Sequence, residues 1–147
     1  MREIKFRGKS VANDKWVYGG IVHYANHYGF TVDKWFITDD EGDNDEVRNN
    51  TIGQYTGLKD RDGTEIYEGD IVAINKELLG CYVIKYDENH AKFGMYINGY
   101  EQAGFNKVTM KAYEVIGNIY DNPELLEERT NEYRRNSEIH ICHIEKT

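Results

Sequence analysis

The chain has 147 residues, a formal net charge of −8 and two cysteines. This length suits one domain, or one domain with a smaller companion, and it is enough to bury a core without a disulfide or a metal. The negative charge disfavours a protein that coats nucleic acid through general positive charge.

Cys81 and Cys142 lie far apart and suggest no disulfide framework. The first residues lack an apolar signal segment, and no apolar run approaches the length of a membrane span, so we expect a cytoplasmic protein.

The composition favours β-strands. The sequence has 14 Ile and 9 Val against 5 Leu, together with 12 Tyr. β-Branched and aromatic residues fit a pleated, half-buried surface, whereas Leu is among the better helix formers. The base composition of the source genome is an alternative origin of this bias, so the order of the residues has to decide the fold class.

The first 37 residues predict a small antiparallel sheet. Ile4 and Phe6 alternate with charged neighbours, which is the period-two pattern of a half-buried strand. Trp16 and Tyr18 then share one face of a second strand. Further short strands are predicted at residues 21–24, 28–32 and 35–37.

An acidic run at residues 39–46 interrupts this pattern, because six of these eight residues are Asp or Glu. Mutual repulsion predicts a solvated, poorly ordered loop, which is the best candidate in the chain for a domain boundary. A calcium-binding EF-hand needs Gly at the sixth loop position and Glu at the twelfth, but a loop that starts at Asp39 has Asn44 and Asn50 there. A solvated loop therefore explains the run better than a calcium site does.

From residue 52 onward, short strands alternate with turns about every ten residues, as in a small barrel or sandwich. We expect Ile71, Ile84 and Phe93 to lie in the core of this region. The predicted strands are residues 53–58, 65–67, 71–74, 82–86, 93–97, 108–112 and 115–120.

A capped helix follows the last of these strands. Asn122 is a suitable N-cap, Pro123 is favoured at the first helical position, and Glu124 complements the helix dipole. We predict that the helix extends to about Asn136. The chain then divides into an N-terminal antiparallel β subdomain (1–50), a barrel (51–121), and a C-terminal helix and tail (122–147).

The tail alternates, with Ile139 and Ile141 on one side, and predicts a short strand. His140, Cys142 and His143 are residue types that bind zinc, but structural zinc normally takes four ligands in two separated pairs. On a strand, His140 and Cys142 share a face while His143 points away from it. We therefore expect no metal and no other cofactor.

Three stretches of the chain resemble the YopX family of bacteriophage and prophage proteins. They are IKFRGK (4–9) leading to KWVYG (15–19), then GQYTGLKD (53–60) leading to IYEGDIV (66–72), and VIGNIY (115–120) followed by NPELL (122–126). The resemblance implies that the C-terminal part is an SH3-like barrel and that the gene is a phage gene expressed in a bacterial host. It implies no catalytic residue.

The sequence offers one candidate interaction surface. Residues 1–20 carry five basic side chains against two acidic ones, and one interpretation is a local nucleic-acid face within an acidic protein. The alternative is that these cations lie on the solvent face of the first strand or beside the acidic loop. Within the stretches that resemble the family, the structural roles of Gln54, Tyr55 and Lys59 are less obvious than those of their neighbours. The resulting candidates are Arg2, Lys5, Arg7, Gln54, Tyr55 and Lys59.

We therefore expect a mainly β protein that acts as a phage accessory protein without enzymatic activity. It would bind a macromolecular partner, a protein or a nucleic acid of host or phage, and would form a homo-oligomer through the C-terminal helix and tail. Two alternatives are open: a small enzyme whose site assembles from scattered carboxylates and histidines, and a purely structural homo-oligomer. A concave site with clustered groups of perturbed pKa would favour the enzyme, and a flat aromatic-basic face would favour binding.

Overall fold

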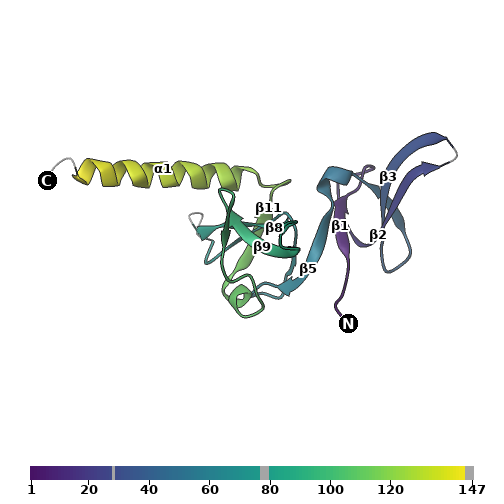
Figure 1. The fold of residues 1–147 in the computed structure, drawn as a ribbon, viewed down its shortest axis with the longest axis horizontal. Helices are drawn as coiled ribbons and strands as arrows, with labels where there is room; N and C mark the ends of the chain where they lie inside the picture. The colour runs from purple at the N-terminus through teal and green to yellow at the C-terminus, as the bar shows by residue number, and fades with distance from the viewer. Residues whose placement is uncertain (28, 77–79, 145–147) are drawn as a thin grey trace. The chain divides into compact units, whose positions relative to one another are not determined.

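The computed structural model describes residues 1–27, 29–76 and 80–144, and the side chains at 26, 27, 30, 31 and 138–144 lie outside this description (Figure 1). The internal contacts of the chain divide it into two compact units. Unit 1 comprises Met1–Leu58 and Glu65–Glu68, and unit 2 comprises Lys59–Thr64 and Gly69–Thr147. Whether 1–50, 51–121 and 122–147 fold as separate domains stays a prediction.

Unit 1 is built on a six-stranded sheet with the order β4-β3-β2-β1-β5-β6. The long hairpin of β2 and β3 is the largest part of it, and a 3-10 helix, η1 (Asn49–Thr51), follows β4. The strands are β1 (Phe6–Lys9), β2 (Trp16–His27), β3 (Phe30–Thr38), β4 (Asn44–Val47), β5 (Gly53–Lys59) and β6 (Glu65–Tyr67). The antiparallel N-terminal sheet predicted from the sequence is confirmed.

The outer edge of β4 is hydrogen-bonded to the chain that follows β1. Ser10 forms an isolated bridge with Val47, and the Val11 N–H donates to the Glu46 carbonyl at 2.8 Å. β1 also approaches β4 closely, since a Cβ placed on Gly8 would lie 3.0 Å from the Cβ of Val47. The β4 edge is thereby protected from pairing with another chain.

The acidic run is ordered, which corrects the expectation of a poorly ordered loop. The carboxylate Oδ1 of Asp39 accepts the N–H groups of Glu41 at 3.0 Å and Asp43 at 2.9 Å, which fixes a tight turn. The remaining residues of the run form β4, in which Glu46 lies opposite Phe36 of β3. Charge repulsion between exposed side chains is weak compared with these backbone bonds, because water screens it.

Unit 2 is built on a five-stranded antiparallel sheet with the order β10-β9-β8-β7-β11. Its core contains Ile71, Ala73, Cys81 and Val83, against which four partly buried residues pack: Ile116, Ile119, Leu125 and Leu126. The strands are β7 (Asp70–Ala73), β8 (Tyr82–Asp87), β9 (Lys92–Ile97), β10 (Tyr100–Gln102) and β11 (Glu114–Asn118), with a 3-10 helix, η3 (Thr109–Ala112), before β11.

The closed SH3-like barrel predicted for 51–121 is not confirmed, since the described strands form no closed barrel. Two of the predicted strands exist as β5 and β6 but join the sheet of unit 1, where Gln54 pairs with Phe6 of β1. The predicted strand at 108–112 is largely η3. Periodicity indicates which residues share a face of a strand, but it does not indicate which other strand the backbone will pair with.

The predicted core residues of unit 2 are mostly confirmed. Ile71 and Ile84 are fully buried. Phe93 is half-buried and packs edge-on against Tyr86, with ring centroids 5.2 Å apart.

The C-terminal helix, α1 (Glu124–Ile144), begins within one residue of the predicted start but is longer than predicted. The Asn122 side chain accepts the Asn118 N–H at 3.2 Å. The predicted strand at Ile139–Ile141 is wrong, because these residues lie within α1. Two alternating isoleucines are too few to separate a period of 2 from one of 3.6, and continuing the helix satisfies the backbone without a sheet edge. No helix in the described part of the chain is long and apolar enough to cross a membrane.

Replacing Ile84 with Ala should lower the free energy of unfolding by about 2–5 kcal/mol, because it removes buried methyl groups and leaves a cavity. Urea unfolding monitored by circular dichroism measures the change. Val108→Ala is the control, since Val108 is 78% exposed and should leave the stability unchanged. An Ile84→Ala protein as stable as the wild type would show that the core has been assigned wrongly.

Candidate binding surface on unit 1

Strand β1 places basic residues opposite aromatic residues of its neighbours. Arg7 lies directly opposite Tyr18 of β2, and Lys9 lies opposite Trp16. On the other side of β1, the Tyr55 N–H of β5 donates to the Lys5 carbonyl at 2.9 Å. Because directly opposite residues share a face of the sheet, cations and rings gather on one side of β1.

These side chains form a stack that we call the cation ladder. The guanidinium of Arg7 lies 4.6 Å from the ring centre of Trp16 and 5.0 Å from that of Tyr67. The Lys5 amino group lies 5.2 Å from the ring centre of Tyr55. Each distance is within the range of a cation–π attraction. The ladder comprises Lys5, Arg7, Lys9, Trp16, Tyr18, Tyr55 and Tyr67.

The cations of the ladder are also held by polar partners within unit 1. The Lys5 amino group pairs with Glu65 at 2.6 Å and with Glu3 at 2.9 Å. Arg7 donates to the Glu68 carbonyl at 3.3 Å and is only 6% exposed. Lys5 and Arg7 therefore make contacts that stabilise unit 1. The excess of basic residues in 1–20 is explained by these contacts better than by a surface that binds phosphate groups.

The environment of the ladder raises the pKa of Lys5 and of Tyr67. The hydrogen bond to Glu65 raises the pKa of Lys5 well above its usual value, so Lys5 is charged. Burial, followed by the hydrogen bond that its hydroxyl donates to Glu65 at 2.8 Å, raises the pKa of Tyr67 far above its usual value. Tyr67 is therefore neutral, and the cationic charge of the ladder rests on its lysines and arginine.

The six predicted surface residues do not form one patch. Lys5, Arg7 and Tyr55 come together in the ladder, where Arg7 and Tyr55 are buried. Gln54 lies opposite Phe6 and therefore on the other face of the sheet. Arg2 and Lys59 are exposed, and Lys59 belongs to unit 2.

Other members of the ladder were not predicted from the sequence. The alternation of Trp16 and Tyr18 indicated that they share a face, but not that this face meets Arg7. Tyr67 could not be found from the sequence, because its contact with Arg7 spans two sheet pairings.

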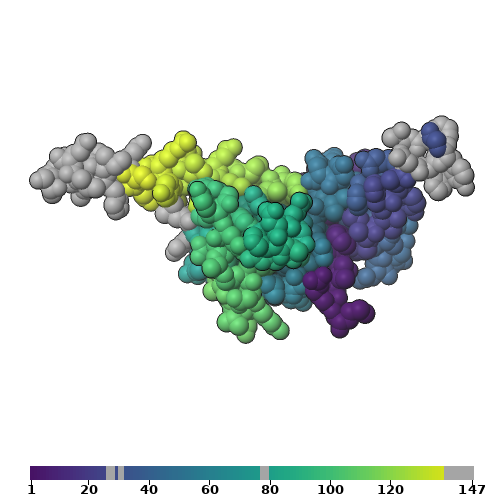
Figure 2. Space-filling model, viewed as in Figure 1, coloured from purple at the N-terminus to yellow at the C-terminus, as the bar shows by residue number. Residues whose placement is uncertain are grey.

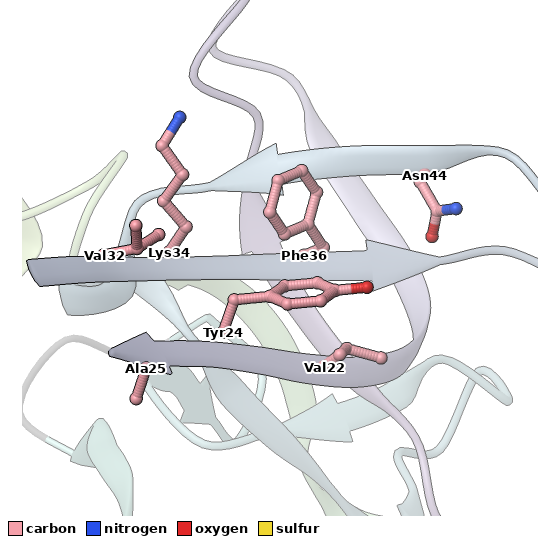
Figure 3. A pocket seen from close by; sticks show the side chains of 7 residues that line it. All are labelled: Val22, Tyr24, Ala25, Val32, Lys34, Phe36 and Asn44. Carbon is pink, nitrogen blue, oxygen red and sulfur yellow. The ribbon is translucent and has the colours of Figure 1, made fainter. Parts of the chain in front are cut away.

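A different surface is open on the β2–β3 hairpin. It contains a pocket of about 440 Å³, which we call the hairpin pocket (Figure 3). Val22 lies opposite Phe36, and Tyr24 lies opposite Lys34. The rings of Tyr24 and Phe36 meet edge to face, with centroids 5.5 Å apart. The pocket is lined by Val22, Tyr24, Ala25, Val32, Lys34, Phe36 and Asn44.

Both faces of this hairpin carry apolar side chains, although one face of an antiparallel sheet is usually polar. On the inner face, Ile37 and Val47 are buried, and His23 stacks on Trp35 with ring centres 3.9 Å apart. On the outer face, an antiparallel sheet normally carries polar residues, yet Val22 is 41% exposed and Tyr24 is 57% exposed. Clustered exposed apolar residues on a folded protein commonly mark an interaction site.

Unit 2 has a polar cluster near the β8–β9 turn. Nδ1 of His90 lies 2.7 Å from Asp87, and the Tyr96 hydroxyl donates to the same carboxylate at 3.3 Å. The hydrogen bond with His90 lowers the pKa of Asp87. The other Asp87 oxygen accepts the Asn89 N–H at 2.9 Å, so this cluster holds the turn.

Asp60 also has a structural role. One of its carboxylate oxygens accepts the N–H groups of Asp62 and Thr64, and the other accepts that of Val115, each at 2.9 Å. Both carboxylate oxygens of Asp60 therefore accept hydrogen bonds from the backbone of unit 2. Within the described ranges, no group of three or more His, Cys, Asp or Glu side chains could hold a metal ion. The side chains of His140, Cys142 and His143 lie outside the described residues.

Comparison with known proteins connects the chain to one family. The family model described as YopX protein matches residues 5–127, which confirms the resemblance seen in the sequence. Among solved structures, the crystal structure of protein EF1440 from Enterococcus faecalis is similar, with a TM-score of 0.55 and 23% sequence identity. The match covers 86% of this chain and 99% of that chain, and at this identity it shows a shared fold alone. No curated protein matches the sequence.

Raising the pH above about 10 should destabilise the wild type more steeply than a Tyr67→Phe variant. Because the pKa of Tyr67 is raised in the folded state, the folded protein keeps a proton that the unfolded chain loses. The stabilisation is complete below the pKa of an unfolded tyrosine and declines as the pH rises through it. Urea unfolding at a series of alkaline pH values measures both slopes. Identical slopes would refute the assignment of a buried, neutral Tyr67.

Proposed function

This chain belongs to the YopX protein family. Neither the family match nor the similar structure indicates an activity. From the surface of the chain itself, we propose that it is a non-enzymatic binding module for a protein partner. The observation that carries the proposal is the hairpin pocket, where valine, tyrosine and phenylalanine side chains line a hollow on the outer face of a sheet. Its volume falls in the range of pockets that accept a ligand or an anchoring side chain.

A protein partner fits this surface better than nucleic acid does. Nucleic-acid binding draws most of its affinity from cations that contact phosphates. The chain carries a net charge of −8, and Lys5 and Arg7 are engaged in the cation ladder. Among the described residues that line the hairpin pocket, Lys34 is the one cation, and it pairs with Glu46 at 3.0 Å.

The character of the pocket favours binding over catalysis. Among the described residues that line it, the polar groups are the Tyr24 hydroxyl, the Lys34 amino group and the Asn44 amide. General acid–base chemistry usually employs paired carboxylates or a histidine within reach of the substrate. The enzyme alternative would need its acids and histidines to be assembled elsewhere in the chain.

We further propose that the protein acts in the cytoplasm of a bacterial host as a phage accessory protein, which is the setting that the family resemblance implies. We also propose that unit 2 is related to the SH3-like barrel, with a sheet that does not close. The support for this relation is the order of its five strands, in which β11 returns to lie beside β7 after η3.

Replacing Tyr24 with Ser should weaken partner binding about tenfold or more, because a central aromatic anchor would be lost. Candidate partners are the proteins that the wild type captures from phage-carrying bacteria. A purified candidate is then titrated by calorimetry against the wild type and the variant. Tyr100→Ser is the matched control, since Tyr100 is 77% exposed on unit 2. Saturable binding that tolerates Tyr24→Ser would place the partner elsewhere, and the proposal would fall.

Self-association through α1 is a second proposal, and it rests on the exposure of the helix. Leu125 and Leu126 pack on the core of unit 2, and Arg129 is 8% exposed. Tyr133 is 63% exposed, and in Figure 2 the yellow stretch of α1 is not covered by other atoms in this view. The part of α1 beyond Thr130 (131–144) is short enough to be marginal as an isolated helix in water, so contact with another copy would stabilise it.

Ending the chain at Thr130 should convert the protein from an oligomer to a monomer, because the exposed part of α1 is removed while Leu125, Leu126 and Arg129 stay on unit 2. Light scattering measures the molar mass of the full and the shortened chain. Equal numbers of subunits in both would exclude α1 as the contact.

A further inference from the structure

The acidic turn adjoins the hairpin pocket. Asn44 lines the pocket and is the first residue of β4, immediately after the β3–β4 turn. In Figure 3, Asn44 lies at the end of the pocket where β3 leaves the sheet and β4 enters it. The turn carries four acidic residues that are all exposed: Asp39, Asp40, Glu41 and Asp43.

Backbone hydrogen bonds hold these acids in place. The Asp39 N–H donates to the Asp43 carbonyl at 3.0 Å, and the Gly42 N–H donates to the Asp39 carbonyl at 3.1 Å. Gly42 has a φ of 91°, a left-handed conformation that suits glycine. A hydrogen bond between the side chains of Thr38 and Asn44 closes the base of the turn. The negative charge is therefore fixed beside the pocket.

The pocket offers little positive charge to neutralise these acids. Lys34 and Glu46 form an ion pair, so their opposite charges neutralise each other. The charges of the acidic turn remain, and Asp43 directly precedes Asn44 in the chain. An apolar hollow with a negative end is complementary to an apolar side chain that has cations next to it.

The geometry of β4 restricts how a partner can bind. A partner strand cannot be added beside β4, because the Val11 N–H and the Lys9 carbonyl already bond to Glu46 and Arg48 along that edge. A partner in the hairpin pocket must therefore bind through side chains that enter from the outer face, and not by pairing with the β4 edge.

We propose that the occupant of the hairpin pocket is a basic segment of a protein partner. An apolar side chain of the segment enters the hollow between Tyr24 and Val32, and neighbouring Lys or Arg residues face the acidic turn. The inference rests on the proposed function, and it gives the acidic run a role in selecting the partner and in accelerating its association.

The test uses a displayed library of random peptides of about twelve residues, long enough to cross the hairpin in an extended conformation. Peptides are selected on the wild type, and those that still bind Tyr24→Ser are discarded. We expect the remaining peptides to be enriched in Lys and Arg around an apolar residue. A D40N/E41Q double variant removes two charges while keeping the Asp39 hydrogen bonds that shape the turn.

Individual peptides are then measured by fluorescence anisotropy at several salt concentrations. The D40N/E41Q variant should bind them about three- to tenfold more weakly and with less dependence on salt, since exposed ion pairs contribute modestly and are screened. The control is E88Q/E128Q, which removes the same charge from exposed positions of unit 2 and should change nothing.

The outcomes separate this inference from the proposed function. If peptides depend on Tyr24 but show no basic enrichment, or bind D40N/E41Q as well as the wild type, the pocket is a binding site and the basic partner is refuted. If no peptide depends on Tyr24, both the inference and the proposed function fail.

Discussion

The guanidinium of Arg7 determines how unit 1 can present itself to other molecules. This charge is buried, and burial of an ion is costly unless rings and carbonyl oxygens replace its water. Trp16 of β2 and Tyr67 of β6 provide the rings, and the Glu68 carbonyl accepts a hydrogen bond. One residue thus connects strands from both sides of β1. Because the positive charge near the N-terminus has this structural role, we place the proposed binding on the β2–β3 hairpin, where apolar side chains are exposed.

The same sheet supports the proposal that the hairpin pocket and the acidic turn form one binding surface. The inner face of the hairpin is committed to the core through Ile37 and Val47. The edge of β4 is committed to the chain after β1 through the Ser10–Val47 bridge. What remains is the outer face with Tyr24 and the turn that carries Asp40 and Glu41. Apolar contact would supply affinity there, and the carboxylates would supply selectivity.

The sequence predicted single strands well and their partners poorly. Alternation at Ile4–Phe6 and at Trp16–Tyr18 indicated a sheet with mixed faces, and the family-like motifs were enough to connect the chain to its relatives. Yet β5 and β6 pair in unit 1 instead of closing a barrel, because period-two patterns carry no information about which edge a strand will join. Lys5, Arg7 and Tyr55 were predicted as candidate residues, but the contacts of Arg7 with Trp16 and Tyr67 were not, for the same reason. The hairpin pocket was not predicted, because the alternation at residues 21–24 does not indicate that Val22 and Tyr24 stay exposed in the folded chain.

Chemical-shift mapping of isotopically labelled protein during titration with a captured partner tests the central claim most directly. The claim is that the hairpin pocket binds while the cation ladder serves the fold. It predicts that the methyl signals of Val22, Ala25 and Val32 change most, together with the backbone signals of the acidic turn, while the indole N–H of Trp16 stays where it is. Large changes at Trp16 and its neighbours on β1, with the methyl signals of the pocket unmoved, would contradict it.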